Sequence, residues 1–425
     1  MMHRRVVIWL AVAIVGVVAA ALLWSMRSAL RTGPDAATSV DAQRGILIRD
    51  SAGVLISELN WLPADIEVLD TAGAAELIAH PEHPWTMVNG AAWLEDGTLV
   101  VGHAGEYRLS IYARPGRIPS LAGRRGSGPG ELEILGWLGT GPDTTLYTYD
   151  IRARRVTRFN RIGAPLADST LIMPGDLPGA GVAGVFRSGR VVLHQVLTPL
   201  GAQGPVRVEF DTALVYIGSA GREEWQRIGP LLLDDWSVVP SSGRLRNGER
   251  AYGRVPREFG RRAMVSVGTR LLFLGQSDSL HIAALDDQGR TRALLRGRLP
   301  RHRLTDAIVA RARVAAMAAM SSSRAREAAA ERYRAFPDVP DRTPALDGAS
   351  LVDNRDRLWL RLFRRPDDPR EDWIRWDPVS GNVVRYSLPP GSDLLAARDG
   401  SVLGRWERSD GSEILRVLAL PGNVD

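Results

Sequence analysis

Short apolar segments separated by polar turns recur along the chain with a period of about 45 residues. In the first copy, Leu99–His103 and Leu109–Ala113 are apolar and a polar turn lies between them. Copies begin at Leu99, Leu146, Val191, Leu271, Leu358 and Val402. The first two steps are 47 and 45 residues, and the last step is 44 residues. Segments of this length and spacing are typical of β-strands joined by tight turns.

A period of about 40 to 50 residues with several short strands in each unit is the signature of a β-propeller. Six starts predict six blades. The steps that flank Leu271, of 80 and 87 residues, then contain insertions. The fold class predicted is all-β: a six-bladed β-propeller over residues 44–425 with a helical-hairpin insertion and an N-terminal transmembrane or signal helix.

The insertion at about residues 304–336 departs from the β pattern. Leu304–Phe336 is rich in Ala and Arg and contains no Gly or Pro. Ser321–Ser323 interrupts it, and Pro337 ends it. We therefore expect two helices between the fourth and fifth blades. They could form a lid over the channel or a docking surface for a partner; alternatively, they could brace the flank of a blade.

The other insertion lies near residues 205–260. Val206–Phe210 and Leu214–Ile217 have the alternating pattern of outer strands of the third blade. The Arg-, Gly- and Ser-rich stretch Ser241–Gly253 predicts a long loop.

The first strands of the predicted domain lie in Gly45–Ser57, where an Asp-Ser-Ala-Gly turn joins two apolar runs. Propellers commonly close by letting an N-terminal strand complete the last blade. We expect this segment to pair near Glu413–Leu418, because a free hairpin would be marginal in water. Residues 32–43 are small and polar, as in a linker.

An uncharged run of 19 residues, Val6–Trp24, follows the basic start of the chain. This is longer than the ~7–15 residues of a signal-peptide core and long enough to span a bilayer. Cleavage near Ala19–Ala21 would leave Leu22–Trp24 exposed. Residues 1–31 therefore predict a signal anchor at the inner membrane, with the propeller on the periplasmic or extracytoplasmic side. A cleaved signal peptide and a secreted protein are the alternative.

The composition excludes several kinds of chemistry. The chain has no Cys, so disulfides, thiolate zinc sites and iron–sulfur clusters are absent. All 54 basic residues other than His are Arg, and the net charge is only +6. These arginines are spread over loops and often lie near acids, as Arg365 does near Asp367, which does not favour nucleic-acid binding.

The most distinctive local string is Gly123–Glu131, Gly-Arg-Arg-Gly-Ser-Gly-Pro-Gly-Glu. A phosphate-binding P-loop would need Gly-Lys-[Ser/Thr] at the start of a helix, and strand-like residues follow here instead. Pro129 and Gly130 predict a type II turn, with Glu131 then entering an innermost strand near the ring axis.

At this string the chain resembles bacterial six-bladed β-propellers related to NHL repeats. The string Gly123–Glu131, the strand Asp143–Asp150, the segment Arg155–Asn160 and the opening Asp50–Val54 carry the resemblance, as does the helical insert before Leu351–Asp353. It covers about residues 45–420 and implies an exported propeller, usually of unassigned function. The chain departs from the family at Gly102-His103, where relatives often have Ala-Asp.

Enzymatic six-bladed propellers of the lactonase type are the main chemical alternative, and they would imply calcium held by oxygen ligands at the channel. The candidates are Asn89, Glu131, Asp150 and Asp353. Isolated carboxylates at strand ends more often cap turns or pair with Arg, so we assign no metal, cofactor-binding or catalytic residue. The segment His80–His83 contains Pro81 and predicts a surface loop rather than a metal-binding helix.

No Gly-x-Ser-x-Gly elbow or Cys nucleophile is present. Tryptophans are spread over the blades, and we expect most of them to pack between blades: Trp93, Trp137, Trp225, Trp236, Trp359, Trp373, Trp376 and Trp406. The sequence predicts an exported, non-enzymatic binding or scaffolding module, monomeric, that recognises an envelope protein or a small ligand. The alternatives are a calcium-dependent hydrolase and an envelope-assembly scaffold.

Overall fold

A computed structural model describes the chain from residue 38 to residue 421. Within that range, residues 42–44, 61, 72, 142–144, 167–170, 173–176, 178, 198–206, 220–223, 245–249, 319–322, 336–338, 365–369, 390 and 409–411 are not described. The predicted anchor over residues 1–31 and most of the predicted linker therefore lie outside the described residues. In the part of the chain that the structure describes, no helix combines the length and apolar character that crossing a membrane needs.

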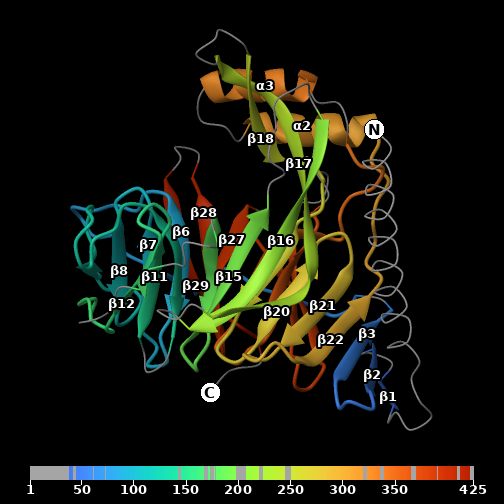
Figure 1. Cartoon of the computed structure of the whole chain (residues 1–425), viewed down its shortest axis with the longest axis horizontal. Helices are drawn as coiled ribbons and strands as arrows, with labels where there is room; N and C mark the ends of the chain where they lie inside the picture. Colours follow the sequence, from blue (N-terminus) through green and yellow to red (C-terminus); the bar gives the residue numbers. More distant parts are fainter. Residues whose placement is uncertain are drawn as a thin grey trace, which may run out of the picture.

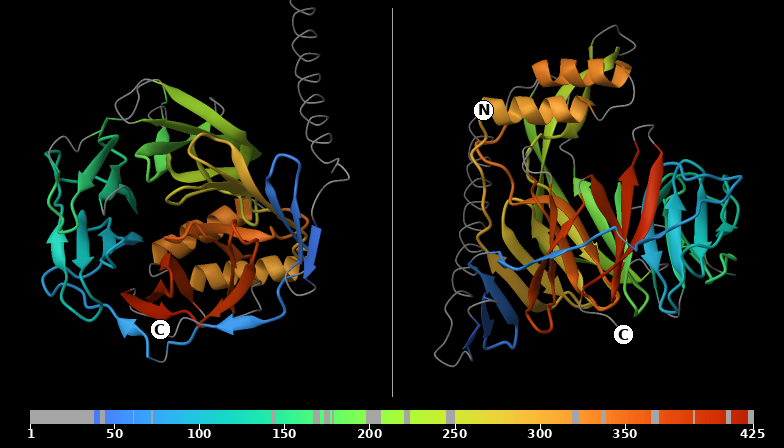
Figure 2. Two further views of the ribbon diagram at one scale, coloured as in Figure 1. Left: turned by 90° about the horizontal axis from the view of Figure 1, so that it is seen from below. Right: turned by 180° about the vertical axis from the view of Figure 1, so that it is seen from behind.

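Six sheets stand around a central axis and form the blades of a propeller (Figures 1 and 2). Blade 1 contains β6 (Val88–Trp93), β7 (Leu99–His103), β8 (Arg108–Tyr112) and β9 (Ser120–Ala122). Blade 2 contains β10 (Leu135–Thr140), β11 (Leu146–Asp150), β12 (Arg155–Phe159) and β13 (Leu171–Ile172). Blade 3 contains β14 (Ala180–Val185), β15 (Arg190–Leu197), β16 (Arg207–Ser219), β17 (Trp225–Arg244) and β18 (Arg250–Pro256).

The other three blades also take up N-terminal strands. Blade 4 contains β19 (Ala263–Val267), β20 (Leu272–Gln276), β21 (Leu280–Leu285) and β22 (Thr291–Gly297), followed by β3 (Leu55–Leu59), β2 (Gly45–Arg49) and β1 (Thr38–Asp41). Blade 5 contains β23 (Leu346–Val352), β24 (Leu358–Leu362), β25 (Glu371–Trp376) and β26 (Val383–Leu388), followed by β4 (Ile66–Val68). Blade 6 contains β27 (Ser392–Arg398), β28 (Ser401–Glu407) and β29 (Glu413–Ala419), followed by β5 (Ala75–Glu76).

The predicted repeat and blade number are confirmed. Each of the six repeat starts coincides, within one residue, with the start of the second strand of a blade. The first strands contact one another around the ring in the order β6, β10, β14, β19, β23, β27 and back to β6. They are therefore the innermost strands and surround the central channel (Figure 2).

The hydrophobic core lies between blades. Among the described residues, six clusters of buried apolar side chains each join two neighbouring blades. Between blades 5 and 6, Trp359 stacks on Tyr386 with ring centroids 4.8 Å apart, beside the buried Trp373. Trp376 packs toward Phe273 between blades 4 and 5, as expected for large rings that fill an interface.

The N-terminal hairpin does not pair with the predicted strand of the last blade. Gly45–Ser57 does form a hairpin, but β3 pairs in parallel with β22 of blade 4. The strand that pairs with β29 in the last blade is β5, at Ala75–Glu76. Between them, β4 pairs in parallel with β26 of blade 5. The N-terminal segment thus runs along the outside of three blades, as a belt, before it enters blade 1 (Figure 2).

The two insertions come together on one face of the ring. The predicted helical hairpin is present as α2 (Asp306–Ala318) and α3 (Ser323–Ala335), and α3 contacts β17. The predicted loop Ser241–Gly253 is wrong at both of its ends, because β17 continues to Arg244 and β18 begins at Arg250, and the two pair from Trp236↔Pro256 to Arg244↔Arg250; residues 245–249 lie outside the described residues. We call the helices together with the projecting ends of β17 and β18 the arm; it rises from the ring in Figure 1.

Candidate functional site

The central channel contains two adjoining cavities. The first, of about 520 Å³, we name the ionic cavity, and the second, of about 630 Å³, the tryptophan cavity. The two share Val265, Ser350, Leu351 and Leu395. The ionic cavity lies at the end of the channel where β6 begins, which is also the end from which the arm rises. The tryptophan cavity lies toward the other end.

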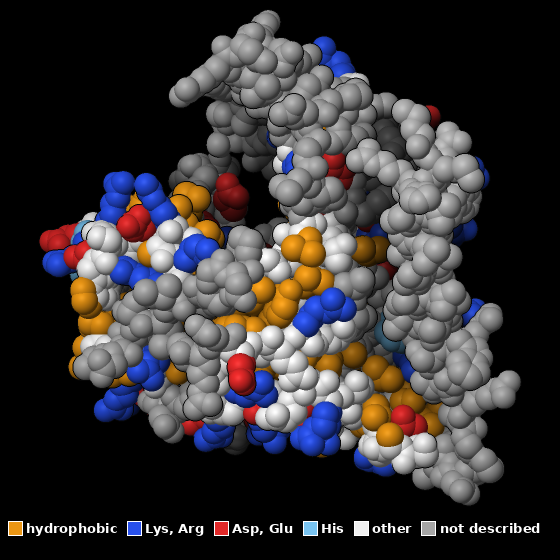
Figure 3. All heavy atoms as spheres, viewed as in Figure 1, with side chains coloured by type: hydrophobic (Ala, Val, Ile, Leu, Met, Phe, Trp, Pro, Cys, Tyr) orange, Lys and Arg blue, Asp and Glu red, His pale blue; other side chains and the backbone are white. Residues whose placement is uncertain are grey.

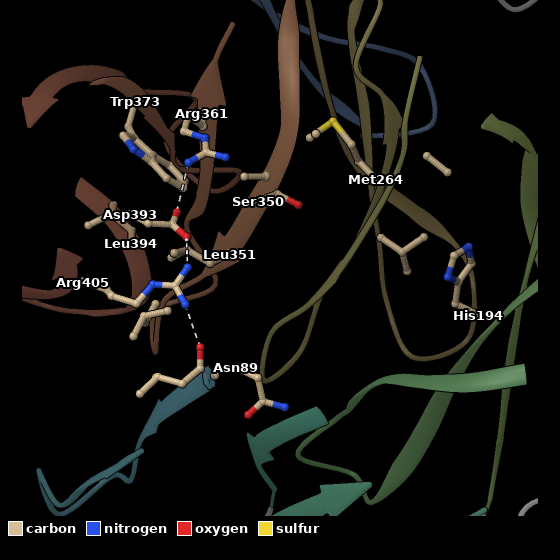
Figure 4. A pocket seen from close by; sticks show the side chains of 17 residues that line it. Asn89, His194, Met264, Ser350, Leu351, Arg361, Trp373, Asp393, Leu394 and Arg405 are labelled. Carbon is tan, nitrogen blue, oxygen red and sulfur yellow. Dashed lines mark hydrogen bonds and ion pairs between the residues drawn. The ribbon is translucent and has the colours of Figure 1, made fainter. Parts of the chain in front are cut away.

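Arg361, Asp393 and Arg405 lie on one wall of the ionic cavity (Figure 4) and belong to a longer row of alternating charges. Arg361 of β24 pairs with Asp347 of β23, and its Nη1 lies 3.1 Å from Oδ1 of Asp393 in the next blade. Nη2 of Arg405 lies 3.0 Å from Oδ2 of Asp393, and its Nη1 lies 3.4 Å from Glu413. The row thus runs across the junction of blades 5 and 6.

The row continues to blade 1. Nη1 of Arg405 donates a 2.7 Å hydrogen bond to the carbonyl of Val88, and the Val88 amide donates to Glu413 at 3.0 Å. Arg405 and Glu413 therefore tie the first strand of the ring to the last blade. Their geometry is fixed by backbone as well as by side-chain partners.

Burial shifts the pKa values of two groups around this cavity. It raises the pKa of Asp347 to about 6, against the opposing effect of Arg361. Burial also lowers the pKa of His194, although nearby Asp234 opposes this. At neutral pH, Asp347 is therefore mostly ionised and the His194 imidazole is neutral.

The opposite wall is less charged. In Figure 4, His194 and Met264 lie across the cavity from the charged row, and Asn89 lies at its edge. The buried Nε2 of His194 finds no hydrogen-bond partner among the described residues. Asn89 uses its Nδ2 to donate to the carbonyl of Leu135 at 2.6 Å, which leaves its Oδ1 as an acceptor.

The four oxygen ligands considered from the sequence are not brought together. Asn89 lines the ionic cavity, whereas Glu131 lies in the connection before β10. The expected turn at Pro129 is present: Gly130 has a φ of 74°, and the Glu131 amide donates to the Gly128 carbonyl. Glu131 does not enter the innermost strand, because its carboxylate bonds back to the Gly128 amide and Arg124.

Asp150 and Asp353 have structural roles at the ends of strands. Asp150 accepts hydrogen bonds from backbone amides that include those of Arg152 and Ala153. Asp353 pairs with Arg357 at 2.7 Å and caps its own turn. Across the described residues, no group of three or more acidic or His side chains has the arrangement of a metal site.

The segment His80–His83 is a surface loop, with the two imidazole rings 5.5 Å apart and tilted. Of the tryptophans expected to pack between blades, Trp359, Trp373 and Trp376 are almost fully buried there. Trp93 and Trp137 are partly buried against the clusters between blades 6 and 1 and between blades 2 and 3, and both also line the tryptophan cavity.

The charged row was missed at the level of the sequence, although a signal for it exists. His194, Arg361 and Arg405 each stand three positions after a repeat start, at Val191, Leu358 and Val402. The same place in the second strand of three blades therefore directs a polar side chain to the ionic cavity. The corresponding residues Gly102, Tyr149 and Leu274 in the other blades hide the pattern, because they are not charged.

Comparison with known proteins gives similarities of fold only. No family model matches the chain, and no curated protein matches it in sequence. A Bacteroides fragilis protein thought to be exported is 10% identical over 86% of this chain and 99% of its own, with a TM-score of 0.45. A gluconolactonase from Xanthomonas campestris is 13% identical over 80% of this chain and 87% of its own, with a TM-score of 0.39.

A streptogramin B lyase is 10% identical over 81% of this chain and 96% of its own, with a TM-score of 0.37. With identities of 13% or less and TM-scores of 0.45 or less, none of these three proteins assigns a function or a residue role to this chain. The resemblance to NHL-related propellers stays a prediction.

Proposed function

We propose that this protein is an exported, non-enzymatic binding module that holds a small, positively charged molecule in the ionic cavity. One observation carries the proposal: a charged row of three acids and two arginines borders a cavity on the propeller axis, and Arg361, Asp393 and Arg405 of that row line it. Fold alone does not imply function, so the proposal rests on this site.

The net charge of the whole row favours a cation. Asp347, Asp393 and Glu413 stand against Arg361 and Arg405, which gives the row a net charge of −1 above pH 6. In a partly desolvated cavity, a like charge on a ligand costs more than it would in water, and an opposite charge gains more. A ligand with an ammonium group would therefore be preferred over a carboxylate of the same shape.

The size and remaining polar groups suit a small molecule. A volume of about 520 Å³ lies within the range of ligand pockets, roughly 300–1,000 Å³. His194 and Asn89 offer uncharged hydrogen-bonding groups on the sides away from the row. The arginines and acids of the row are already paired with one another, which supports recognition rather than acid–base catalysis.

Export is supported by the uncharged run Val6–Trp24 with its basic flank. In this proposal the propeller lies outside the cytoplasm, on an anchor or after signal cleavage. The arm would then be available to an envelope partner on the same face as the mouth of the ionic cavity.

The test is calorimetric titration of the full chain with benzylamine and with benzoate, which share a ring but carry opposite charges. We expect benzylamine to bind at least about tenfold more tightly, a difference of about 1.4 kcal/mol. Ala349→Phe places a ring in the ionic cavity and should abolish this binding. Ala183→Phe, which lies only on the tryptophan cavity, is the matched control and should retain it.

Equal binding of the two probes, or unchanged benzylamine binding by folded Ala349→Phe, would contradict the proposal. Thermal unfolding after EDTA treatment, with and without calcium, tests the hydrolase alternative. A calcium ion at about 100 times its dissociation constant would add about 2.7 kcal/mol to the unfolding free energy. Such a rise would favour a calcium-dependent enzyme over the binding module.

A further inference from the structure

The tryptophan cavity is lined differently from the ionic cavity. Polar side chains such as Glu95, Arg187 and Asp353 share its wall with aliphatic and aromatic ones, which are Ala91, Ala92, Trp93, Trp137, Leu138, Ala183, Val185, Val265, Val267, Leu351, Val352, Leu395, Ala396 and Ala397. These residues come from all six innermost strands. Apolar surface around an open cavity is costly in water, and burying it against a ligand is favourable.

The ring of Trp137 occupies space that is free only because residue 139 is a glycine. A Cβ on Gly139 would lie 2.2 Å from Cζ2 of Trp137, so the indole lies directly over the backbone of its own strand β10. Any other residue at 139 would push the ring away. The absence of a side chain here therefore fixes an aromatic surface on the cavity wall.

Trp93, on the neighbouring strand β6, supplies the second ring. Arg398 lies over it, 5.1 Å from the ring centroid. The buried Nε1 of Trp93 finds no acceptor among the described residues.

The charges of this cavity are balanced. Nη2 of Arg187 lies 3.5 Å from Oε1 of Glu95, and Asp353 is paired with Arg357. Arg187 and Glu95 belong to blades 3 and 1, so their ion pair crosses the rim in front of blade 2. Exposed pairs of this kind contribute only about 0–1 kcal/mol and can open readily.

We propose that the tryptophan cavity is a second binding site, for an uncharged planar aromatic molecule. The rings of Trp93 and Trp137 and the aliphatic side chains of the wall contact this molecule. The ion pair between Glu95 and Arg187 partly covers the rim. This site is independent of the charge preference of the ionic cavity.

The test uses 4-hydroxybenzophenone, an uncharged aromatic ketone that attaches covalently to nearby C–H groups when irradiated. The full chain is labelled, digested and mapped by mass spectrometry. We expect adducts on the peptides that contain β6 and β10. Ala183→Phe, which fills the cavity, should reduce this labelling at least about tenfold, whereas Ala349→Phe should leave it unchanged.

Gly139→Val is a second variant, and it should also reduce labelling because it displaces the Trp137 ring. Thermal unfolding shows which variants are folded. Adducts that map elsewhere, or undiminished labelling in folded Ala183→Phe and Gly139→Val, would overturn the proposal. Loss of benzylamine binding in Ala349→Phe with retained labelling would show that the two sites are separate, and failure of one would not imply failure of the other.

Discussion

Aspartates at the ends of strands serve one purpose in this chain, and those in the channel serve another. Oδ1 of Asp353 accepts from the amides two and four positions ahead, as Oδ1 of Asp50 and of Asp286 also does. This is the local hydrogen bonding that makes Asp favourable in turns. Asp347 also accepts from the amide two positions ahead, but it and Asp393 in addition face arginines across strands and blades beside the ionic cavity.

Asp347 should make stability depend on pH. Its folded pKa of about 6 lies above the ordinary value of 3.8, so the folded state binds the proton more tightly than the unfolded chain. The unfolding free energy therefore falls as pH rises from about 4 to about 6, by at most about 3 kcal/mol. Asp347→Asn should remove this fall, as measured by denaturant titration at several pH values.

The exposed loop residue Asp65 gives the matched control for this measurement, as Asp65→Asn. That variant should keep the dependence of the parent. An Asp347→Asn protein with the same slope between pH 4 and 6 as the parent would contradict the assignment.

At the scale of elements, the arm combines pieces of two insertions that are distant in sequence. Nη2 of Arg313 on α2 lies 2.8 Å from Oε2 of Glu258, which follows β18. The Arg313 guanidinium also lies over the ring of Tyr333 on α3. Burial raises the pKa of Glu258, while Arg313 opposes that rise. One side chain therefore joins both helices to blade 3.

Arg313→Ala should loosen the arm without unfolding the ring. Removing the guanidinium leaves Glu258 mostly buried without this partner, which costs about 1–3 kcal/mol. Hydrogen exchange should become faster in α2 and α3 and stay unchanged in β6–β8. Arg311→Ala, on the exposed side of the same helix, is the control; an equal effect of both variants would argue against the role given to Arg313.

For the whole molecule, ring closure depends on the belt formed by β3, β4 and β5. These strands bind blades 4, 5 and 6 in turn. Leu55, Ile56, Leu59, Leu69 and Leu77 are buried along this path. The belt therefore connects the blades at the end of the chain to the segment that enters blade 1.

Deleting residues 1–77 should prevent stable folding. Five buried aliphatic side chains at about 1.5–3 kcal/mol each amount to roughly 7–15 kcal/mol as an upper estimate, similar to the whole stability of a typical protein. Deleting residues 1–44 removes from the described strands only β1 and should leave a cooperative unfolding transition. Circular dichroism during heating distinguishes the two, and a stable ring without residues 1–77 would refute the role of the belt.

The sequence by itself determined the blades and the helical hairpin. Each blade has a local pattern of alternating apolar residues and turn residues, and each start at Leu99, Leu146 and their counterparts marks a second strand. Ala-rich residues without Gly or Pro likewise specify helices by local preference. These features depend on neighbours in the chain, so they can be read along it.

Only the tertiary structure decided the partners. Gly45–Ser57 has the pattern of a hairpin whichever blade it joins, and the choice of β22 over β29 depends on distant edges meeting in space. The segments Ser241–Arg244 and Arg250–Gly253 are polar and contain Gly, so they form strands because pairing outweighs weak local preference. The ionic row joins Asp347, Arg361, Asp393, Arg405 and Glu413 because the ring brings blades 5 and 6 together, and no local pattern predicts that proximity.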